Sequence, residues 1–147
     1  MAIAVGQEAP DFTLRDEDGQ DVTLSALKGT PVVLVFYSFD FSGICTAEHC
    51  DIRDNYSSWM DNGAKVFGIS RDSIFAHKAF KEREGFQHSL LADLKGEVAT
   101  EYDTWNAAVG AAERATVVIG SDGKVAYYTK NAIPNARDHS DVAEHIK

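Results

Sequence analysis

Apolar positions along the chain form short continuous runs in some places and helically spaced sets in others. The run PVVLVFY at 31–37 is unbroken and rich in β-branched residues, which is typical of a strand buried on both faces of a sheet. A second strand is predicted over 64–70. Between them, apolar positions over 45–60 recur at helical spacing until Asn62 and Gly63 end the segment. This order predicts a βαβ unit with 31–37 as its central strand.

The flanking segments predict smaller elements around this unit. These are a hairpin of strands 11–16 and 21–24, a helical turn at 25–29, a helix that begins at Asp72 or Ser73 and ends at Gly85, a short helix at 97–103, a hairpin of strands 114–120 and 124–130, and a helical tail from Arg137. The helix that ends at Gly85 carries Phe75, Ala76, Ala79 and Phe80 on its predicted apolar side. The combined order predicts an α/β protein of one domain over 1–147, with an N-terminal β-hairpin and a mixed central sheet flanked by helices.

Composition narrows the classes of function. A chain of 147 residues can remove roughly 70% of its unfolded surface from water, so it needs no disulfide to fold. Its longest apolar run, about seven residues, is far shorter than a membrane span, and its first residues lack the features of a signal peptide. We therefore expect a cytoplasmic protein. A net charge of −9 without a basic cluster argues against nucleic-acid and membrane partners.

Both cysteines of the chain lie where the strand at 31–37 gives way to the predicted helix. Active sites of open α/β sheets lie at the carboxyl ends of strands. Near a helix start, unpaired N–H groups and the helix dipole favour the thiolate form of Cys45. Ser42 can cap this helix or donate its hydroxyl to a substrate oxygen, and Gly43 lets the backbone approach a bound molecule. In a reducing compartment, this pair of cysteines indicates a transient catalytic disulfide or a metal site.

The spacing of Cys45 and Cys50 has a geometric consequence. Helix positions five apart are separated by roughly 8–9 Å between Cα atoms, which is beyond the reach of a disulfide. Cys45 lies on the apolar stripe with Ile52 and Tyr56 and is expected to face inward, whereas Cys50 points elsewhere. A disulfide between the two therefore requires the first turns of the helix to unwind.

The segments GQEAPDFTL, VVLVFY, FDFSGICTAEHC and RATVVI together resemble the peroxiredoxins over nearly the whole chain. The resemblance implies a thioredoxin-like fold and a peroxidase without metal or cofactor that reduces hydrogen peroxide and organic hydroperoxides. It implies that Cys45 attacks the peroxide and becomes a sulfenic acid. It also implies that Ser42 and Arg114 hold the two peroxide oxygens, and that Gly43 and Ile44 complete the substrate site.

Subgroup features of the resemblance point in two directions. The position of Cys50 is similar to the Q-type, or bacterioferritin-comigratory, subgroup, in which the second cysteine forms an intramolecular disulfide that thioredoxin reduces. The segments DFTLRDEDGQDVTL and FDFSGIC look closer to the one-cysteine E-type alkyl hydroperoxide reductase, in which Cys50 would be an inert thiol and another thiol the reductant. Glu48 is similar to an acidic residue that orients the arginine. The family pattern has proline where this chain has Ser38, which adds an N–H and a hydroxyl beside the sulfur.

Three other interpretations stay open. A thioredoxin-like disulfide oxidoreductase shares the fold but uses C-x-x-C rather than C-x-x-x-x-C. A metal site built on Cys45, His49 and Cys50 needs a fourth ligand. The remaining histidines are scattered and are predicted to lie at the surface: His77, His88, His139 and His145. The chain could also be a peroxiredoxin-like scaffold that has lost turnover. Neither the preferred peroxide nor the choice between monomer and homodimer follows from the sequence.

Overall fold

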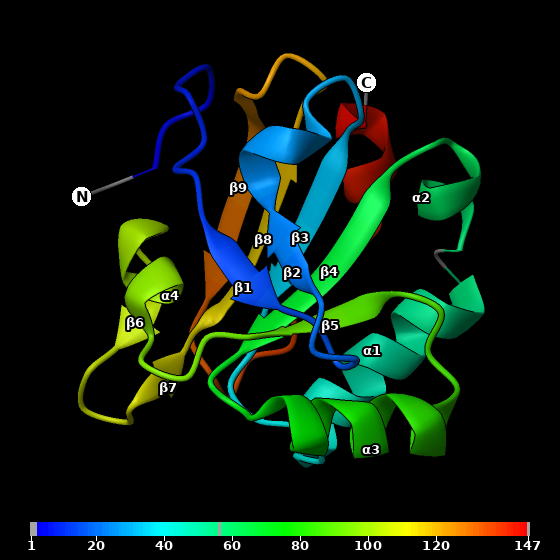
Figure 1. Ribbon diagram of the computed structural model, residues 1–147, viewed down its shortest axis with the longest axis vertical. Helices are drawn as coiled ribbons and strands as arrows, with labels where there is room; N and C mark the ends of the chain where they lie inside the picture. Colours follow the sequence, from blue (N-terminus) through cyan, green and yellow to red (C-terminus); the bar gives the residue numbers. More distant parts are fainter. Residues whose placement is uncertain (1–2, 56, 147) are drawn as a thin grey trace.

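The computed structural model describes residues 3–55 and 57–146 and contains a mixed seven-stranded sheet with helices on both faces (Figure 1). The strands of this sheet are β1 (Thr13–Arg15), β2 (Asp21–Thr23), β3 (Val32–Phe36), β4 (Lys65–Ser70), β5 (Ser89–Ala92), β8 (Arg114–Ile119) and β9 (Val125–Asn131), in the order β2-β1-β5-β4-β3-β8-β9. Strands β3, β4 and β5 run parallel, whereas β8 pairs antiparallel with both β3 and β9. The expected α/β class with a mixed sheet is confirmed.

The helices and the remaining short elements connect these strands. They are α1 (Gly43–Asn55), α2 (Ser58–Asp61), α3 (Ile74–Glu84), α4 (Glu97–Glu101), the 3-10 helices η1 (Leu24–Leu27) and η2 (Val142–His145), and a separate pair of strands, β6 (Trp105–Asn106) and β7 (Ala111–Ala112). The Ser73 hydroxyl caps α3 by accepting a hydrogen bond from the Ala76 N–H at 3.2 Å. Gly85 ends α3 with φ of 70°, a left-handed conformation that glycine adopts without steric cost.

Strand β3 contributes to a hydrophobic core on each face of the sheet, and all five of its residues are buried. Leu34 and Phe36 point to the face where Tyr102, at the end of α4, packs. Val33 and Val35 point to the other face, into the cluster that includes residues of α1 and α2. Each such side chain contributes about 1.5–3 kcal/mol by burial. This packing fixes the end of β3, and with it the start of α1.

The N-terminal hairpin of β1 and β2 lies at one edge of the sheet, as expected. It joins the sheet through the antiparallel pairing of Arg15 in β1 with Ala92 in β5. Strand β5 is absent from the sequence-based prediction because four apolar or half-polar residues do not distinguish a strand from a loop. No described helix combines the length and the apolar character that crossing a membrane requires.

Three predictions about helices are wrong in detail. The single helix over 45–60 is in fact α1 followed by α2, and Tyr56 lies outside the described residues. Ser57 is the N-cap residue of α2, in keeping with the preference of serine for helix starts over helix interiors. The predicted apolar side of α3 is rotated, because Phe75 is 79% exposed while His77 is fully buried. The tail from Arg137 is irregular up to the short helix η2.

Candidate active site

The loop between β3 and α1 places Cys45 in the first turn of α1, at the carboxyl end of β3. The Cys45 side chain is completely buried, as its place on the apolar stripe predicts. Ser42 precedes the helix, and its hydroxyl accepts a long hydrogen bond of 3.4 Å from the Cys45 N–H. The expected cap is therefore present at the turn that carries Cys45.

Two polar side chains contact the Cys45 sulfur directly. Arg114 Nη1 donates to Sγ at 3.1 Å, and Ser38 Oγ lies 3.2 Å from Sγ. Burial raises the pKa of the Cys45 thiol, but hydrogen bonds from Ser38, Ser42, the Phe39 backbone and Arg114 outweigh burial and hold the pKa below its ordinary value. The structure thus brings together four of the residues expected at the site and favours the thiolate.

Arg114 is itself held by a buried carboxylate. It is 2% exposed and donates from Nη1 to Glu48 Oε1 at 2.6 Å, so it is no surface residue. Arg137 donates to the other carboxylate oxygen of Glu48, from its N–H at 2.8 Å and from Nε at 3.0 Å. Burial raises the pKa of Glu48, but the charges of Arg137 and Arg114 outweigh burial and lower it. The Glu48 carboxylate therefore fixes two buried guanidinium groups, and that of Arg114 contacts the Cys45 sulfur.

Removing the charge of Glu48 should be strongly destabilising. Glu48→Gln removes the carboxylate that two buried arginines share, and breaking a buried ion pair in this way costs about 3–5 kcal/mol of unfolding free energy. We expect this loss in urea unfolding at pH 7. Glu82→Gln, at an exposed position of α3, is the matched control and should change stability by less than about 0.5 kcal/mol. Equal stabilities of the two variants would contradict the role assigned to Glu48.

Cys50 lies away from Cys45, as the helical spacing predicts. Both cysteines are free thiols, and α1 is helical throughout the segment that joins them. Cys50 is half-buried, and its Sγ donates to Glu84 Oε1 at 3.4 Å. Burial and this carboxylate raise the pKa of the Cys50 thiol. The two thiols therefore differ in kind, because the surroundings of Cys45 favour the anion on balance and those of Cys50 favour the neutral thiol.

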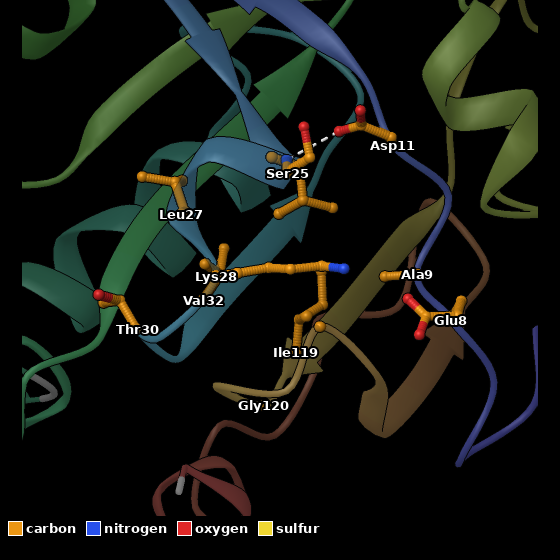
Figure 2. Close-up of a pocket in the computed structure, with 12 residues that line it drawn as sticks. Glu8, Ala9, Asp11, Ser25, Leu27, Lys28, Thr30, Val32, Ile119 and Gly120 are labelled. Atoms are coloured by element: carbon orange, nitrogen blue, oxygen red, sulfur yellow. Dashed lines mark hydrogen bonds between the residues drawn. The ribbon is translucent and has the colours of Figure 1, made fainter.

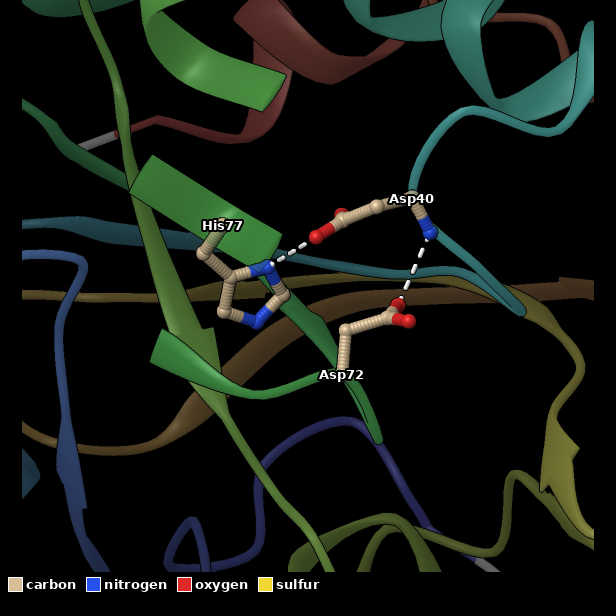
Figure 3. Close-up of side chains that lie close together, drawn as sticks. All are labelled: Asp40, Asp72 and His77. Carbon is tan, nitrogen blue, oxygen red and sulfur yellow. Dashed lines mark hydrogen bonds and ion pairs between the residues drawn. The ribbon is translucent and has the colours of Figure 1, made fainter. Parts of the chain in front are cut away.

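A buried network anchors the loop that carries Ser38 and Ser42 (Figure 3). The Asp40 N–H donates to Asp72 Oδ2 at 2.8 Å, and an Asp40 carboxylate oxygen lies 2.7 Å from His77 Nδ1. His77 Nε2 lies 2.9 Å from the Leu91 carbonyl, which can only accept, so this nitrogen carries a proton. Tyr37 also donates its hydroxyl to Asp40. These bonds tie the loop to α3, to β5 and to the segment between β4 and α3.

The expectation of surface histidines is wrong for three of the four residues named. His77, His88 and His139 are 0–2% exposed, and only His145 is partly exposed. His49 is also buried, and its Nδ1 lies 2.8 Å from Nε2 of His88. Burial lowers the pKa of His88 to about 3 and holds that of His49 well below its ordinary value. Since His49 faces His88 and Cys50 faces Glu84, the geometry gives no support to the metal site built on Cys45, His49 and Cys50.

The structure adds residues that the sequence analysis missed. Arg137 comes from an irregular segment, and its partner Glu48 lies 89 positions earlier in the chain. The His49–His88 contact joins residues 39 positions apart. No local pattern marks either contact, because neither shares a helix face or a strand register.

A cavity, whose lining residues Figure 2 shows, lies at the other end of the sheet and does not coincide with the site. It measures about 100 Å³ and is bounded by Val32, where β3 begins, and Ile119, where β8 ends. Asp11 accepts a hydrogen bond from the Ser25 N–H at its rim, at 2.8 Å. The cavity is lined by neither cysteine nor histidine. The site at Cys45 is therefore identified by the chemistry of its side chains and not by the presence of a cavity.

Comparison with known proteins gives one consistent result. The AhpC/TSA family matches residues 5–128. Peroxiredoxin Q, a chloroplastic protein of Oryza sativa subsp. japonica, is 39% identical over 133 residues, which cover 88% of this chain and 60% of that protein. Peroxiredoxin Bcp of Bacillus subtilis is 36% identical over 131 residues, covering 85% of this chain and 83% of the relative. The chain thus spans about 60% of the length of the plant relative and most of the bacterial one.

Two solved structures share the fold over nearly the whole chain. Enterococcus faecalis AhpC matches with a TM-score of 0.88 at 25% identity, covering 97% of this chain and 89% of the other. Peroxidoxin BcpB from Mycobacterium tuberculosis matches with a TM-score of 0.84 at 32% identity, covering 96% and 94%. These likenesses agree with the thioredoxin-like fold expected from the resemblance. The chain therefore belongs to the AhpC/TSA family.

Proposed function

We propose that the chain is a thiol peroxidase that reduces hydrogen peroxide and organic hydroperoxides. The observation that carries this proposal is the environment of Cys45, a buried sulfur with Arg114 Nη1 at 3.1 Å and Ser38 Oγ at 3.2 Å, at the start of α1. A thiolate held by such donors is a nucleophile ready for attack. The plant and bacterial relatives bear the name peroxiredoxin.

The first step is attack of the Cys45 thiolate on one oxygen of the peroxide. A sulfur–oxygen bond forms, the O–O bond breaks, and the leaving oxygen takes up a proton to give an alcohol or water. The sulfur is oxidised by two electrons to a sulfenic acid. Arg114 and the Ser42 hydroxyl stabilise the negative charge that develops on the oxygens, and one such fixed donor is worth on the order of 10²–10³-fold in rate. Gly43 and Ile44, at the start of α1, complete the substrate site.

Glu48 and Arg137 act in this proposal by positioning Arg114. The Glu48 carboxylate is shared between the two guanidinium groups, and Arg137 also donates to the Ala115 carbonyl at 2.7 Å, next to Arg114 in β8. The Arg114 side chain is therefore already fixed next to the sulfur and loses little conformational freedom in the reaction. Preorganised charge of this kind acts without a reorganisation cost during reaction.

The second step is resolution of the sulfenic acid by Cys50. A disulfide forms between the two sulfurs, water leaves, and a dithiol reductant such as thioredoxin then returns both cysteines to thiols. The one-cysteine route, with an external thiol, is the second candidate. It is favoured by the contact of Cys50 with Glu84, because the raised pKa of Cys50 makes it a poor thiolate in the closed helix. A cytoplasmic location and a monomer or homodimer remain predictions.

Mass spectrometry after one equivalent of hydrogen peroxide tests the function. We expect the reduced protein to lose two hydrogens, as a 45–50 disulfide requires, and Cys50→Ser to gain one oxygen. Gain of oxygen by the parent protein, with a free Cys50, would favour the one-cysteine route. An unchanged mass in both proteins would overturn the proposal and leave the scaffold interpretation in place.

A further inference from the structure

Ser38 gives the reactive sulfur a hydrogen-bonding group that the family pattern lacks. Ser38 follows Tyr37 at the end of β3, is 3% exposed, and has its hydroxyl oxygen 3.2 Å from Cys45 Sγ. The sulfur itself has no exposed surface, so its polar contacts come from the protein. A proline at position 38 would offer neither a hydroxyl nor an N–H. The contact therefore depends on the serine that this chain carries at position 38.

The direction of this hydrogen bond follows from the protonation state of the sulfur. A thiolate carries no proton and can only accept, so the Ser38 hydroxyl must donate to it. When the sulfur is a neutral thiol, the same hydroxyl makes only a weak hydrogen bond, because a thiol is a poor donor and a poor acceptor. A bond to the charged form is about twice as strong as a neutral one. The Ser38 contact thus favours the anion over the thiol, alongside the contact from Arg114.

We propose that Ser38 is a further catalytic residue, whose hydroxyl donates to the Cys45 sulfur and holds it as the attacking anion. This inference deepens the proposed function and rests on it for its kinetic consequence. The hydroxyl contact itself can be tested without peroxide. Ser38 here takes a direct part at the sulfur, in addition to its place in the loop.

A donor on the sulfur has two opposing effects on the rate of attack. It raises the fraction of thiolate at low pH, but it also withdraws electron density, and the nucleophilicity of a thiolate falls as its pKa falls. When the pKa of the thiol falls by one unit, the rate constant for attack by the thiolate falls by about 2.5–3-fold. We therefore expect Ser38 to speed attack at low pH and to slow it at high pH.

The test uses Ser38→Ala, Ser38→Pro and Ser38→Thr, each in a Cys50→Ser background so that Cys45 is the one thiol present. The first readout is the rate of alkylation by iodoacetamide as a function of pH. Ala and Pro both lack the hydroxyl and should shift the profile to higher pH by the same amount, whereas Thr should keep the parent profile. The second readout is single-turnover reaction with hydrogen peroxide, in which the Ala and parent profiles should cross. Urea unfolding establishes that each variant is folded.

The outcomes separate the hydroxyl from the backbone. An unchanged alkylation profile in Ser38→Ala would overturn the proposal, and so would a shift in Ser38→Pro alone, which would trace to the backbone. If Ser38→Ala does not fold, Ser38→Val against Ser38→Thr decides in the same way, because both keep the backbone N–H and only threonine carries a hydroxyl. If Ser38→Ala shifts the alkylation profile but the parent protein does not react with peroxide, the contact would be upheld and the proposed function refuted.

Discussion

Replacing Cys45 with serine is expected to abolish peroxide consumption, whereas replacing Cys50 with serine should preserve one fast turnover. Cys45 sits among donors that favour its anion, and a serine hydroxyl at that position has no general base to activate it. We expect the Cys45→Ser variant to consume hydrogen peroxide no faster than buffer. The measurement is peroxide loss after rapid mixing with one equivalent of enzyme.

The two variants are matched, because each removes one thiol from the same helix. In Cys50→Ser nothing traps the first oxidation product, so sulfenic acid and then sulfinic acid should accumulate. The steady-state rate with thioredoxin as reductant should fall accordingly. Full activity in Cys45→Ser would refute the assignment of the nucleophile. An undiminished thioredoxin-coupled rate in Cys50→Ser would instead show that Cys50 is a bystander.

Much of the sheet could be predicted because burial on both faces leaves a readable pattern. Strand β3 is a continuous apolar run, β8 is apolar except for Arg114 and Thr116, and the cap Ser73 and the stop Gly85 mark α3 locally. The predicted apolar side of α3 is wrong because a polar residue, His77, occupies one of the two buried positions of this helix. Hydropathy cannot anticipate this, since the burial of His77 depends on its hydrogen bonds to other elements.

The candidate site divides in the same way between local and distant contacts. The local contacts of Cys45 are that of its sulfur with Ser38 and that of its N–H with Ser42, and both serines lie within seven positions of it. Arg114 and Glu48 were expected from resemblance to a family, and the structure places them 2.6 Å apart. Arg137 was not expected at all, because an arginine in an irregular segment normally faces solvent. Only the fold shows that Arg137 shares the carboxylate of Glu48.

Oxidation is expected to open the first turns of α1. The helix is intact over Gly43–Asn55 in the reduced protein, and Cα atoms five positions apart on a helix are roughly 8–9 Å from each other, too far for a disulfide. The bonded state therefore cannot keep 45–50 helical. The rate of amide hydrogen exchange over 42–55 should rise on the order of 10³-fold. This is the increase expected if opening α1 costs about 4 kcal/mol in the reduced protein and the oxidised segment is already open.

Hydrogen exchange before and after one equivalent of peroxide checks this expectation. Strands β3 and β4 are internal controls and should stay protected, and a thiol reductant should reverse the change. Cys50→Ser is the matched control, because it is oxidised without forming the disulfide and should keep its helix. Helical protection over 45–50 in a protein whose two sulfurs are bonded would contradict the geometry.

The same opening should depend on pH, because α1 carries His49 into its buried contact with His88. Burial holds the pKa of His49 well below the ordinary 6.5 in the closed helix, whereas the open segment restores it. The open form therefore binds a proton that the closed form excludes, so the contribution of His49 to helix stability is complete above about pH 6.5 and is lost as the pH falls below it. Opening of the reduced helix should become about tenfold more frequent for each pH unit below this value. Amide hydrogen exchange over 42–55, corrected for its chemical rate, measures the effect. The His49→Gln variant should not show the pH dependence, because glutamine does not titrate. A pH profile that is flat in the parent protein, or equally steep in the variant, would show that another group controls the opening.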